Sequence, residues 1–198
     1  WTMLQRYRVA MVRAEREPLF GQVEVDETLV GGVEHGGKRG RGTSKNIVLI
    51  AVEVKQPKGF GRVRMRHVPD ASASLLPFVR DVVAPGALVS TDGWGGYNDL
   101  PKHGYVHRQT VLSESGDPAH VAMPGVHRIA SLLKRWILGT HQGSVTPEHL
   151  QSYLEEFTFR FNRRTSRSRG LVFRRLLEQA IVTDPITEAD VTHGYRWG

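Results

Sequence analysis

The sequence has 198 residues, no cysteine and a formal net charge of +7 at pH 7, from 27 Lys and Arg against 20 Asp and Glu. The lack of cysteine excludes disulfides, thiol catalysis and cysteine-ligated zinc. The longest strongly apolar run, at 47–52, is far shorter than the roughly 20 residues that span a bilayer, so we expect no membrane association. The basic excess predicts a polyanionic partner, in the first place nucleic acid.

The N-terminal part of the chain has the pattern of a helix followed by strands. Residues 1–19 carry apolar side chains at helical spacing. Because the sequence does not begin with Met, we expect this helix to connect to a region that precedes Trp1. Strands are predicted at 20–28 and 61–68, where apolar and polar residues alternate, so we expect one face in a core and the other turned to solvent. A further strand at 46–54 is apolar almost throughout, as in a strand buried on both faces. The three strands indicate a meander.

Further along, two strands give way to helices. A helix is predicted at 74–84, with Ser74 as its N-cap and Pro77 in its first turn, and strands follow at 87–92 and 105–111. Three more helices are predicted where apolar residues recur every three or four positions, at 126–137, 147–164 and 171–181. The last of these is expected to pack through Phe173, Leu176, Leu177, Ala180 and Ile181.

This order of elements indicates an α/β fold with a mixed five-stranded sheet flanked by helices. The arrangement is that of an RNase H-like fold, which we expect to extend over residues 20–181 as one domain, followed by a poorly ordered C-terminal tail at 182–198. In that fold a carboxylate in the middle of the first strand meets one at the end of the fourth, and a later helix supplies a third ligand. Asp26 and Asp92 occupy the first two of these places.

The two aspartates indicate a particular chemistry. Asp26 is at the centre of QVEVDETLVGG, residues 22–32, and taken alone it is equally a turn residue at a strand end. Two carboxylates from different strands, however, raise each other's pKa unless a cation lies between them. Magnesium suits such a site because it prefers oxygen ligands. Two ions about 4 Å apart activate a water or a 3′-hydroxyl for phosphodiester displacement, so the pair predicts nuclease or strand-transfer chemistry.

Four motifs in order carry a closer resemblance. Together VEVDETLVGG, STDGWGGY, SLLKRWILGTHQGSV and EHLQSYLEEFTFRFNRR resemble the DDE-type catalytic domain of ISXO-like bacterial insertion-sequence transposases, over about residues 20–181. The resemblance implies metal-dependent cleavage at element ends and strand transfer into target DNA, with Mg²⁺ (or Mn²⁺) as two bound ions. It also implies a homo-oligomer on DNA, a cytoplasmic, nucleoid-associated location, and a zinc-ribbon or helix-turn-helix region upstream.

By this resemblance Asp26 is the first acidic ligand and Asp92 the second. The third position departs from the family, whose members have Glu or Asn seven residues before a Lys on the helix, whereas His127 stands seven before Lys134 here. Neutral imidazole binds divalent ions, Mn²⁺ better than Mg²⁺, so His127 is our candidate for a third metal ligand. The alternatives are an ordinary helix histidine, or a third carboxylate from the 155–156 pair, Glu155 or Glu156, which is otherwise a solvated pair.

Basic residues supply the candidate DNA contacts. Lys134 is expected to hold a terminal DNA phosphate beside the metals, with Arg135 as a weaker candidate. A glycine-rich loop is expected to follow the DNA backbone without reading bases, or else to be no more than a hairpin tip, through Lys38, Arg39, Arg41 and Lys45. Additional phosphate contacts are expected from Arg160, Arg163 and Arg164.

Aromatic residues and histidines near Asp92 have two interpretations each. Trp94 and Tyr97 either stack on a base near the cut or pack in the core beside Asp92. His103 and His107 have the spacing of a zinc pair but flank a strand and lack a third ligand, so we discount them.

Three functions remain open from the sequence. The first is a transposase that hydrolyses and transesterifies phosphodiesters. The second is an RNase H-like nuclease that cuts without joining. The third is an inactive transposase remnant that binds DNA and performs no metal-dependent chemistry.

Overall fold

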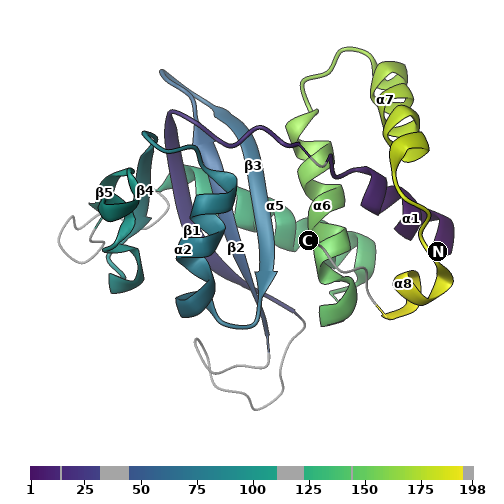
Figure 1. The fold of residues 1–198 in the computed structure, drawn as a ribbon, viewed down its shortest axis with the longest axis horizontal. Helices are drawn as coiled ribbons and strands as arrows, with labels where there is room; N and C mark the ends of the chain where they lie inside the picture. Colours follow the sequence, from purple (N-terminus) through teal and green to yellow (C-terminus); the bar gives the residue numbers. More distant parts are fainter. Residues whose placement is uncertain (14, 32–44, 111–122, 144, 194–198) are drawn as a thin grey trace. The chain divides into compact units, whose positions relative to one another are not determined.

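A mixed five-stranded sheet in the order β3-β2-β1-β4-β5 is the central element of the fold (Figure 1). Its strands are β1 Gln22–Val30, β2 Asn46–Val54, β3 Phe60–Val68, β4 Leu88–Asp92 and β5 Val106–Thr110. The first three strands form an antiparallel meander, whereas β4 pairs in parallel with β1 on one side and with β5 on the other. The predicted α/β, RNase H-like arrangement of a mixed five-stranded sheet is thereby confirmed.

The computed structural model describes residues 1–13, 15–31, 45–110, 123–143 and 145–193. These divide into two compact units, one formed by Pro18–Val145 and the other by Trp1–Glu17 together with Thr146–Gly198. The sheet belongs to the first unit. The single domain expected at 20–181 therefore falls into two groups of contacts, and its boundaries stay a prediction. Within the described residues, no helix combines the length and apolar character needed to cross a membrane.

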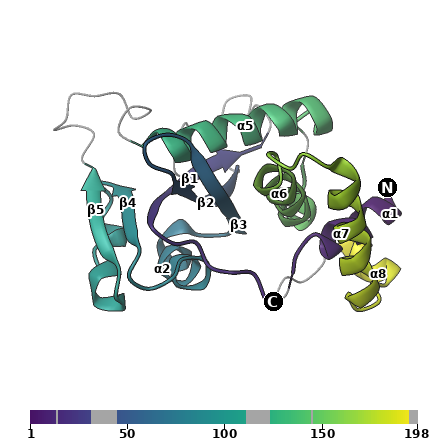
Figure 2. The same ribbon diagram turned by 90° about the horizontal axis from the view of Figure 1, so that it is seen from above.

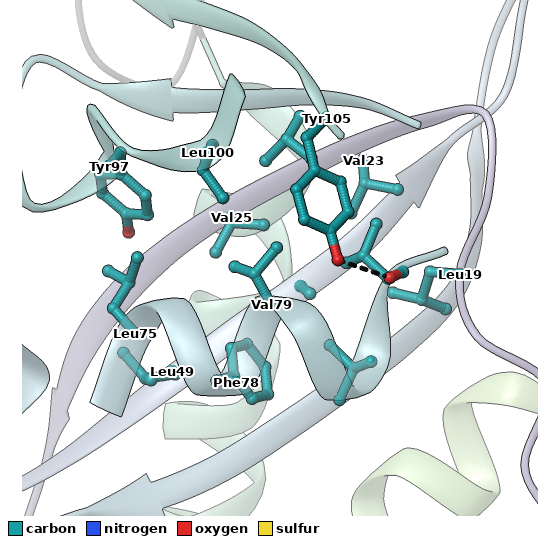
Figure 3. Close-up of a cluster of buried hydrophobic side chains, with 14 of the residues drawn as sticks. Leu19, Val23, Val25, Leu49, Leu75, Phe78, Val79, Tyr97, Leu100 and Tyr105 are labelled. Atoms are coloured by element: carbon teal, nitrogen blue, oxygen red, sulfur yellow. Dashed lines mark hydrogen bonds between the residues drawn. The ribbon is translucent and has the colours of Figure 1, made fainter. Parts of the chain in front are cut away.

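Helices cover both faces of the sheet, with α2 (Ala71–Val82) on one side and α5 (Pro124–His141) on the other (Figure 2). Successive residues of a strand point to opposite faces, so Val23 and Val25 enter the core under α2 (Figure 3). Glu24 and Asp26 face α5. The alternating pattern led us to expect a solvent-facing second side, which was wrong, because Glu24 is only 3% exposed beneath α5.

Helix α2 begins one turn earlier than its predicted N-cap Ser74. Its N-cap is Asp70, whose carboxylate accepts a hydrogen bond from the backbone N–H of Ser72 at 2.9 Å. As a result Pro77 lies inside the helix rather than in its first turn. The earlier start allows Ala71 to be buried in the same apolar stripe as Leu75, which offsets the loss of one backbone hydrogen bond at the proline.

The second unit is helical. It contains α1 (Thr2–Ala10), α6 (Pro147–Asn162), α7 (Arg169–Val182) and α8 (Glu188–His193), and α1 packs against the other three. The expected packing of the 171–181 helix holds only in part, because Leu176, Leu177 and Ala180 are half-buried, whereas Phe173 and Ile181 are 58% and 82% exposed. The expected tail at 182–198 contains α8, whose Val191 is buried.

Candidate active site

Asp26 and Asp92 are brought together by the parallel pairing of β1 with β4. The pairing aligns Gln22 with Leu88 and Glu24 with Ser90. Continuing the same register by two residues places Asp26 beside Asp92, with both side chains on the face that α5 covers. Since neighbouring strands lie roughly 4.8 Å apart, the two carboxylates share one site at the point where the strand pairing ends.

The environment of Asp26 concentrates negative charge. Burial and, to a smaller extent, the nearby carboxylates of Glu27, Asp92 and Glu24 together raise the pKa of Asp26 to about 7, while the hydrogen bond from the Glu27 N–H to Oδ1 at 2.8 Å acts in the opposite direction. A carboxyl group with this pKa holds a proton for part of the time near neutral pH. A cation placed between these oxygens would replace that proton.

Asp92 is held by the turn that follows β4. Its Oδ1 accepts a hydrogen bond from the backbone N–H of Trp94 at 3.1 Å. Tyr97 is fully buried and contacts the Trp94 ring edge-on at a centroid distance of 5.9 Å. Tyr97 therefore packs in the core, as one of its two interpretations proposed, and is not available to stack on a base. Half-buried Trp94 packs against the same core.

Glu24 is a site residue that the sequence did not single out. Its Oε2 accepts a hydrogen bond from the backbone N–H of Val126 at 3.0 Å, in the first turn of α5. Burial raises the pKa of Glu24, and the N–H groups of Val126 and Gly125 partly offset this effect. Gly125 allows this close approach, because a Cβ there would lie 2.7 Å from Oε2. Glu24 thus anchors the start of α5 directly to the strand that carries Asp26.

Lys134 is the residue of α5 whose charge reaches the aspartates. Partial removal of water around its ammonium group lowers the pKa of Lys134, repulsion from Lys45 lowers it further, and Asp26 acts in the opposite direction. Lys45 stands just before β2 and lies close enough to Lys134 to repel it. Arg135, the next residue of α5, is exposed.

His127 lies in the first turn of α5, half-buried and directly after the residue that Glu24 anchors. Its backbone carbonyl accepts a hydrogen bond from Ser131 Oγ at 2.8 Å. Among the described residues, no three side chains of His, Cys, Asp or Glu lie close enough together to hold a metal ion. The role of His127 as a third metal ligand stays a prediction.

The donor set at Asp26 and Asp92 fits a hard divalent cation. Both side chains offer carboxylate oxygens, the ligands that Mg²⁺ prefers, and often only one or two carboxylates hold that ion in phosphate-processing sites. Burial and the neighbouring carboxylates make the charged form of Asp26 unfavourable, so its pKa is raised. A divalent cation would supply compensating positive charge, and phosphate oxygens and water would complete its coordination.

The other candidates take different places. Lys38, Arg39 and Arg41 lie outside the described residues. The interpretation of Glu155 and Glu156 as a solvated pair was wrong, because both are buried in the helical unit. Their alternative role as a third carboxylate ligand stays a prediction. They form ion pairs with Arg16 at 2.7 Å and Arg8 at 2.8 Å.

The histidines near Asp92 also have separate roles. His103 is exposed, in the short 3-10 helix Leu100–His103. Nε2 of His107 lies 2.8 Å from Oγ1 of the buried Thr91, beside Asp92. This contact connects β5 to β4 and helps to fix the strand end that carries the second aspartate.

Comparison with known proteins agrees with this geometry. Residues 18–162 match the model of the ISXO2-like transposase domain. An "Uncharacterized transposase-like protein" of Haemophilus influenzae is 27% identical over 111 residues, which cover 56% of this chain and 89% of that protein. A chain of the simian T-cell lymphotropic virus intasome, solved by cryoEM in complex with PP2A regulatory subunit B56 gamma, gives a TM-score of 0.46 at 14% identity, over 79% of this chain and 54% of that one. On the family match, the chain belongs to the ISXO2-like transposase domain family.

Proposed function

We propose that this chain catalyses metal-dependent cleavage of DNA at the ends of an insertion sequence and joins the freed 3′-hydroxyl to target DNA. The observation that carries the proposal is the register that places Asp26 beside Asp92, with the charge of Lys134 close to Asp26. Membership of a transposase family supports the choice of DNA as the substrate.

Asp26 and Asp92 are the residues that would hold the divalent cations, Mg²⁺ or Mn²⁺, with His127 as the proposed third ligand. When bound, two such ions activate a water or a 3′-hydroxyl and stabilise the leaving oxygen of the phosphodiester. The chain's own part is to keep the two carboxylates at fixed strand positions. The hydrogen bond from Trp94 to Asp92 and the contact between Thr91 and His107 hold one of them in place.

Lys134 would bind a phosphate oxygen of the DNA end next to the cut. Its ammonium group is a compact point charge, which suits phosphate contact without base reading. Glu24 keeps Lys134 in place indirectly, because its bond to the Val126 N–H fixes the start of the helix two turns before Lys134. Lys45 adds positive charge on the same side.

The test is cleavage and joining of a labelled duplex that carries the DNA flanking the gene, in Mg²⁺ and in Mn²⁺. Asp92→Asn is expected to abolish both products, whereas the control Asp99→Asn, an exposed aspartate paired with Lys102, is expected to keep them. For the third ligand, His127→Ala is compared with His103→Ala, an exposed histidine. Loss of product in His127→Ala, with stronger wild-type activity in Mn²⁺, supports an imidazole ligand.

Three results would contradict the proposal or part of it. Cleavage without any joined product would indicate a nuclease. Salt-sensitive DNA binding with no metal-dependent product from the wild type would indicate a DNA-binding remnant. Full activity of His127→Ala would remove this residue from the metal site while leaving Asp26 and Asp92 in place.

A further inference from the structure

The helical unit carries a concentration of positive charge outside the candidate active site. Between residues 160 and 175 the sequence has seven arginines and no acidic residue. Two of these arginines are Arg163, at the C-cap of α6, and Arg175, on α7. We consider them together with a third arginine from another segment, Arg13, which follows α1. We call Arg13, Arg163 and Arg175 the arginine cluster. All three lie outside residues 18–162, the part that matches the transposase family.

Three separate segments bring the arginine cluster together. Helix α1 packs against both α6 and α7, so the three segments belong to one packed group of helices. Burial lowers the pKa of Arg163, and the charges of Arg13 and Arg175 lower it further. The guanidinium groups of Arg13 and Arg175 are therefore each near enough to that of Arg163 to repel it. Like charges gathered in this way destabilise the fold slightly unless an anion binds between them.

Two neighbouring arginines of the same stretch pair with carboxylates, unlike the members of the cluster. Arg160 pairs with Glu156 at 3.3 Å, and Arg174 pairs with Glu178 at 2.8 Å. Within the described residues, by contrast, no carboxylate forms an ion pair with a member of the arginine cluster.

Arg163 is held in place for binding. Its Cζ lies 3.8 Å from the centroid of the Phe159 ring, and its Nη1 donates to the Phe159 carbonyl at 3.5 Å. Phe159 is only 5% exposed, so the ring is a fixed support. A guanidinium that is stacked on its face keeps its N–H edge available, and that edge matches the oxygens of a phosphate. Arg13 and Arg175 are exposed, so both are accessible to a polyanion.

We propose that the arginine cluster binds the phosphate backbone of DNA, as a second DNA contact separate from the metal site. DNA is the polyanion that the proposed function makes the substrate, so this inference rests on that choice of substrate and not on the catalytic chemistry. Three guanidinium groups from three segments suit consecutive phosphates along a backbone, which binds without reading the base sequence.

The test is the affinity of the whole protein for a fluorescently labelled DNA duplex, measured by anisotropy at several salt concentrations. Arg175→Gln and Arg174→Gln form a matched pair, since both remove one positive charge from adjacent exposed positions of α7. Arg175→Gln is expected to weaken binding about tenfold at 0.1 M salt and to reduce the slope of log K against log salt by about 1. For Arg174→Gln we expect less than a twofold change, because Glu178 already neutralises this charge.

Two further variants test the other members. Arg13→Gln combined with Arg175→Gln is expected to reduce the slope by about 2. Arg175→Lys keeps the charge and is expected to restore most of the affinity, which a purely structural role would not predict. Thermal unfolding of each variant serves as the check that the helical unit remains folded.

Equal losses in Arg174→Gln and Arg175→Gln would overturn the proposal, because they would indicate a general charge effect and no site. If Arg13→Gln combined with Arg175→Gln weakened binding to RNA of the same length but not to DNA, the arginine cluster would be assigned to RNA. This experiment separates the inference from the proposed function. If the protein neither cuts nor joins DNA but Arg175→Gln still weakens DNA binding, the proposed function fails and this inference stands.

Discussion

The site around Asp26 and the arginine cluster both gather like charges, but the two regions tolerate that charge in opposite ways. Asp26 is surrounded by Glu24, Glu27 and Asp92 on a buried sheet face, and its pKa rises to about 7. The arginine cluster is on helix ends and a connecting segment, where Arg13 and Arg175 are exposed and stay charged. The first region takes up a proton when no cation is present, whereas the second remains positive.

The difference indicates two kinds of partner. A rigid, partly buried set of carboxylates fits a small ion whose ligands must be placed accurately. An open set of arginines fits a long polyanion that makes many individually weak contacts. Variants in the first region should therefore change chemistry and stability, and variants in the second should change affinity and its salt dependence.

The largest effect is expected from neutralising the acidic pair. Asp26→Asn or Asp92→Asn keeps the side-chain shape and removes the charge that holds the cations, which supply several kcal/mol of transition-state stabilisation. We expect cleavage of the element-end duplex to fall by at least about 10³-fold. Affinity for that duplex in EDTA should stay within about twofold of wild type, because the arginine cluster is intact. A large loss of affinity in EDTA would show that the two regions are not independent.

The next effect concerns stability without metal. The pKa of Asp26 is about 7 in the folded chain against 3.8 as its ordinary value, so the folded state binds the proton more tightly. The contribution of Asp26 to the free energy of unfolding should therefore be highest below pH 4. It should decrease as the pH rises from about 4 to 7, by on the order of 3 kcal/mol.

Asp26→Asn should remove this decrease, so it should be more stable than wild type at pH 8 and about equal at pH 4. Thermal unfolding in EDTA at both pH values measures the difference. Mg²⁺ at pH 8 should raise the melting temperature of the wild type and leave that of Asp26→Asn nearly unchanged. If both proteins depend on pH in the same way, the pKa of Asp26 is not raised.

A smaller effect is expected from the glycine that lets Glu24 reach α5. In Gly125→Ala the new Cβ would lie 2.7 Å from Glu24 Oε2 and 3.0 Å from Val52 Cγ1, which is too close for either neighbour. Overpacking of this kind costs about 1–3 kcal/mol. Gly139→Ala on the same helix is the control, because its Cβ would meet no atom within 4 Å and should stabilise the helix by up to about 1 kcal/mol. Denaturant unfolding of the pair gives the comparison, and equal stabilities would exclude tight packing at Gly125.

Some features of the fold and of the candidate site can be predicted from the sequence. The strand positions of Asp26 and Asp92 were predicted correctly because strand alternation is a local property, and their proximity was expected because the order of elements is that of an RNase H-like fold. The anchoring role of Glu24 was missed because its partner, Val126, is 102 residues away. A hint existed, since Glu24 shares a strand face with Asp26, but the pattern does not show that a distant helix covers that face.

Long-range partners explain the other errors as well. Glu155 and Glu156 have the composition of a solvated pair, yet Arg16 and Arg8, 139 and 148 residues earlier in the chain, allow both to be buried. Phe173 and Ile181 have helical spacing, but no partner covers them within the described residues. Periodicity predicts that a helix has an apolar face and does not predict that a neighbour buries it.

The smallest effect is expected where the two regions resemble each other, at the basic residue closest to the acidic site. Lys134→Ala removes a charge near Asp26, and we expect about a tenfold lower affinity for the DNA end together with slower cleavage. Arg135→Ala removes the same charge from the next, exposed position of α5, and less than a twofold change is expected. The difference in DNA affinity between Lys134→Ala and Arg135→Ala should be largest for duplexes that end at the cut. It should be absent for long duplexes without an end, whose binding the arginine cluster dominates. If Lys134→Ala instead weakened both kinds of duplex equally, Lys134 would act as a general DNA contact like Arg175, and the acidic site would lack a phosphate-binding residue of its own.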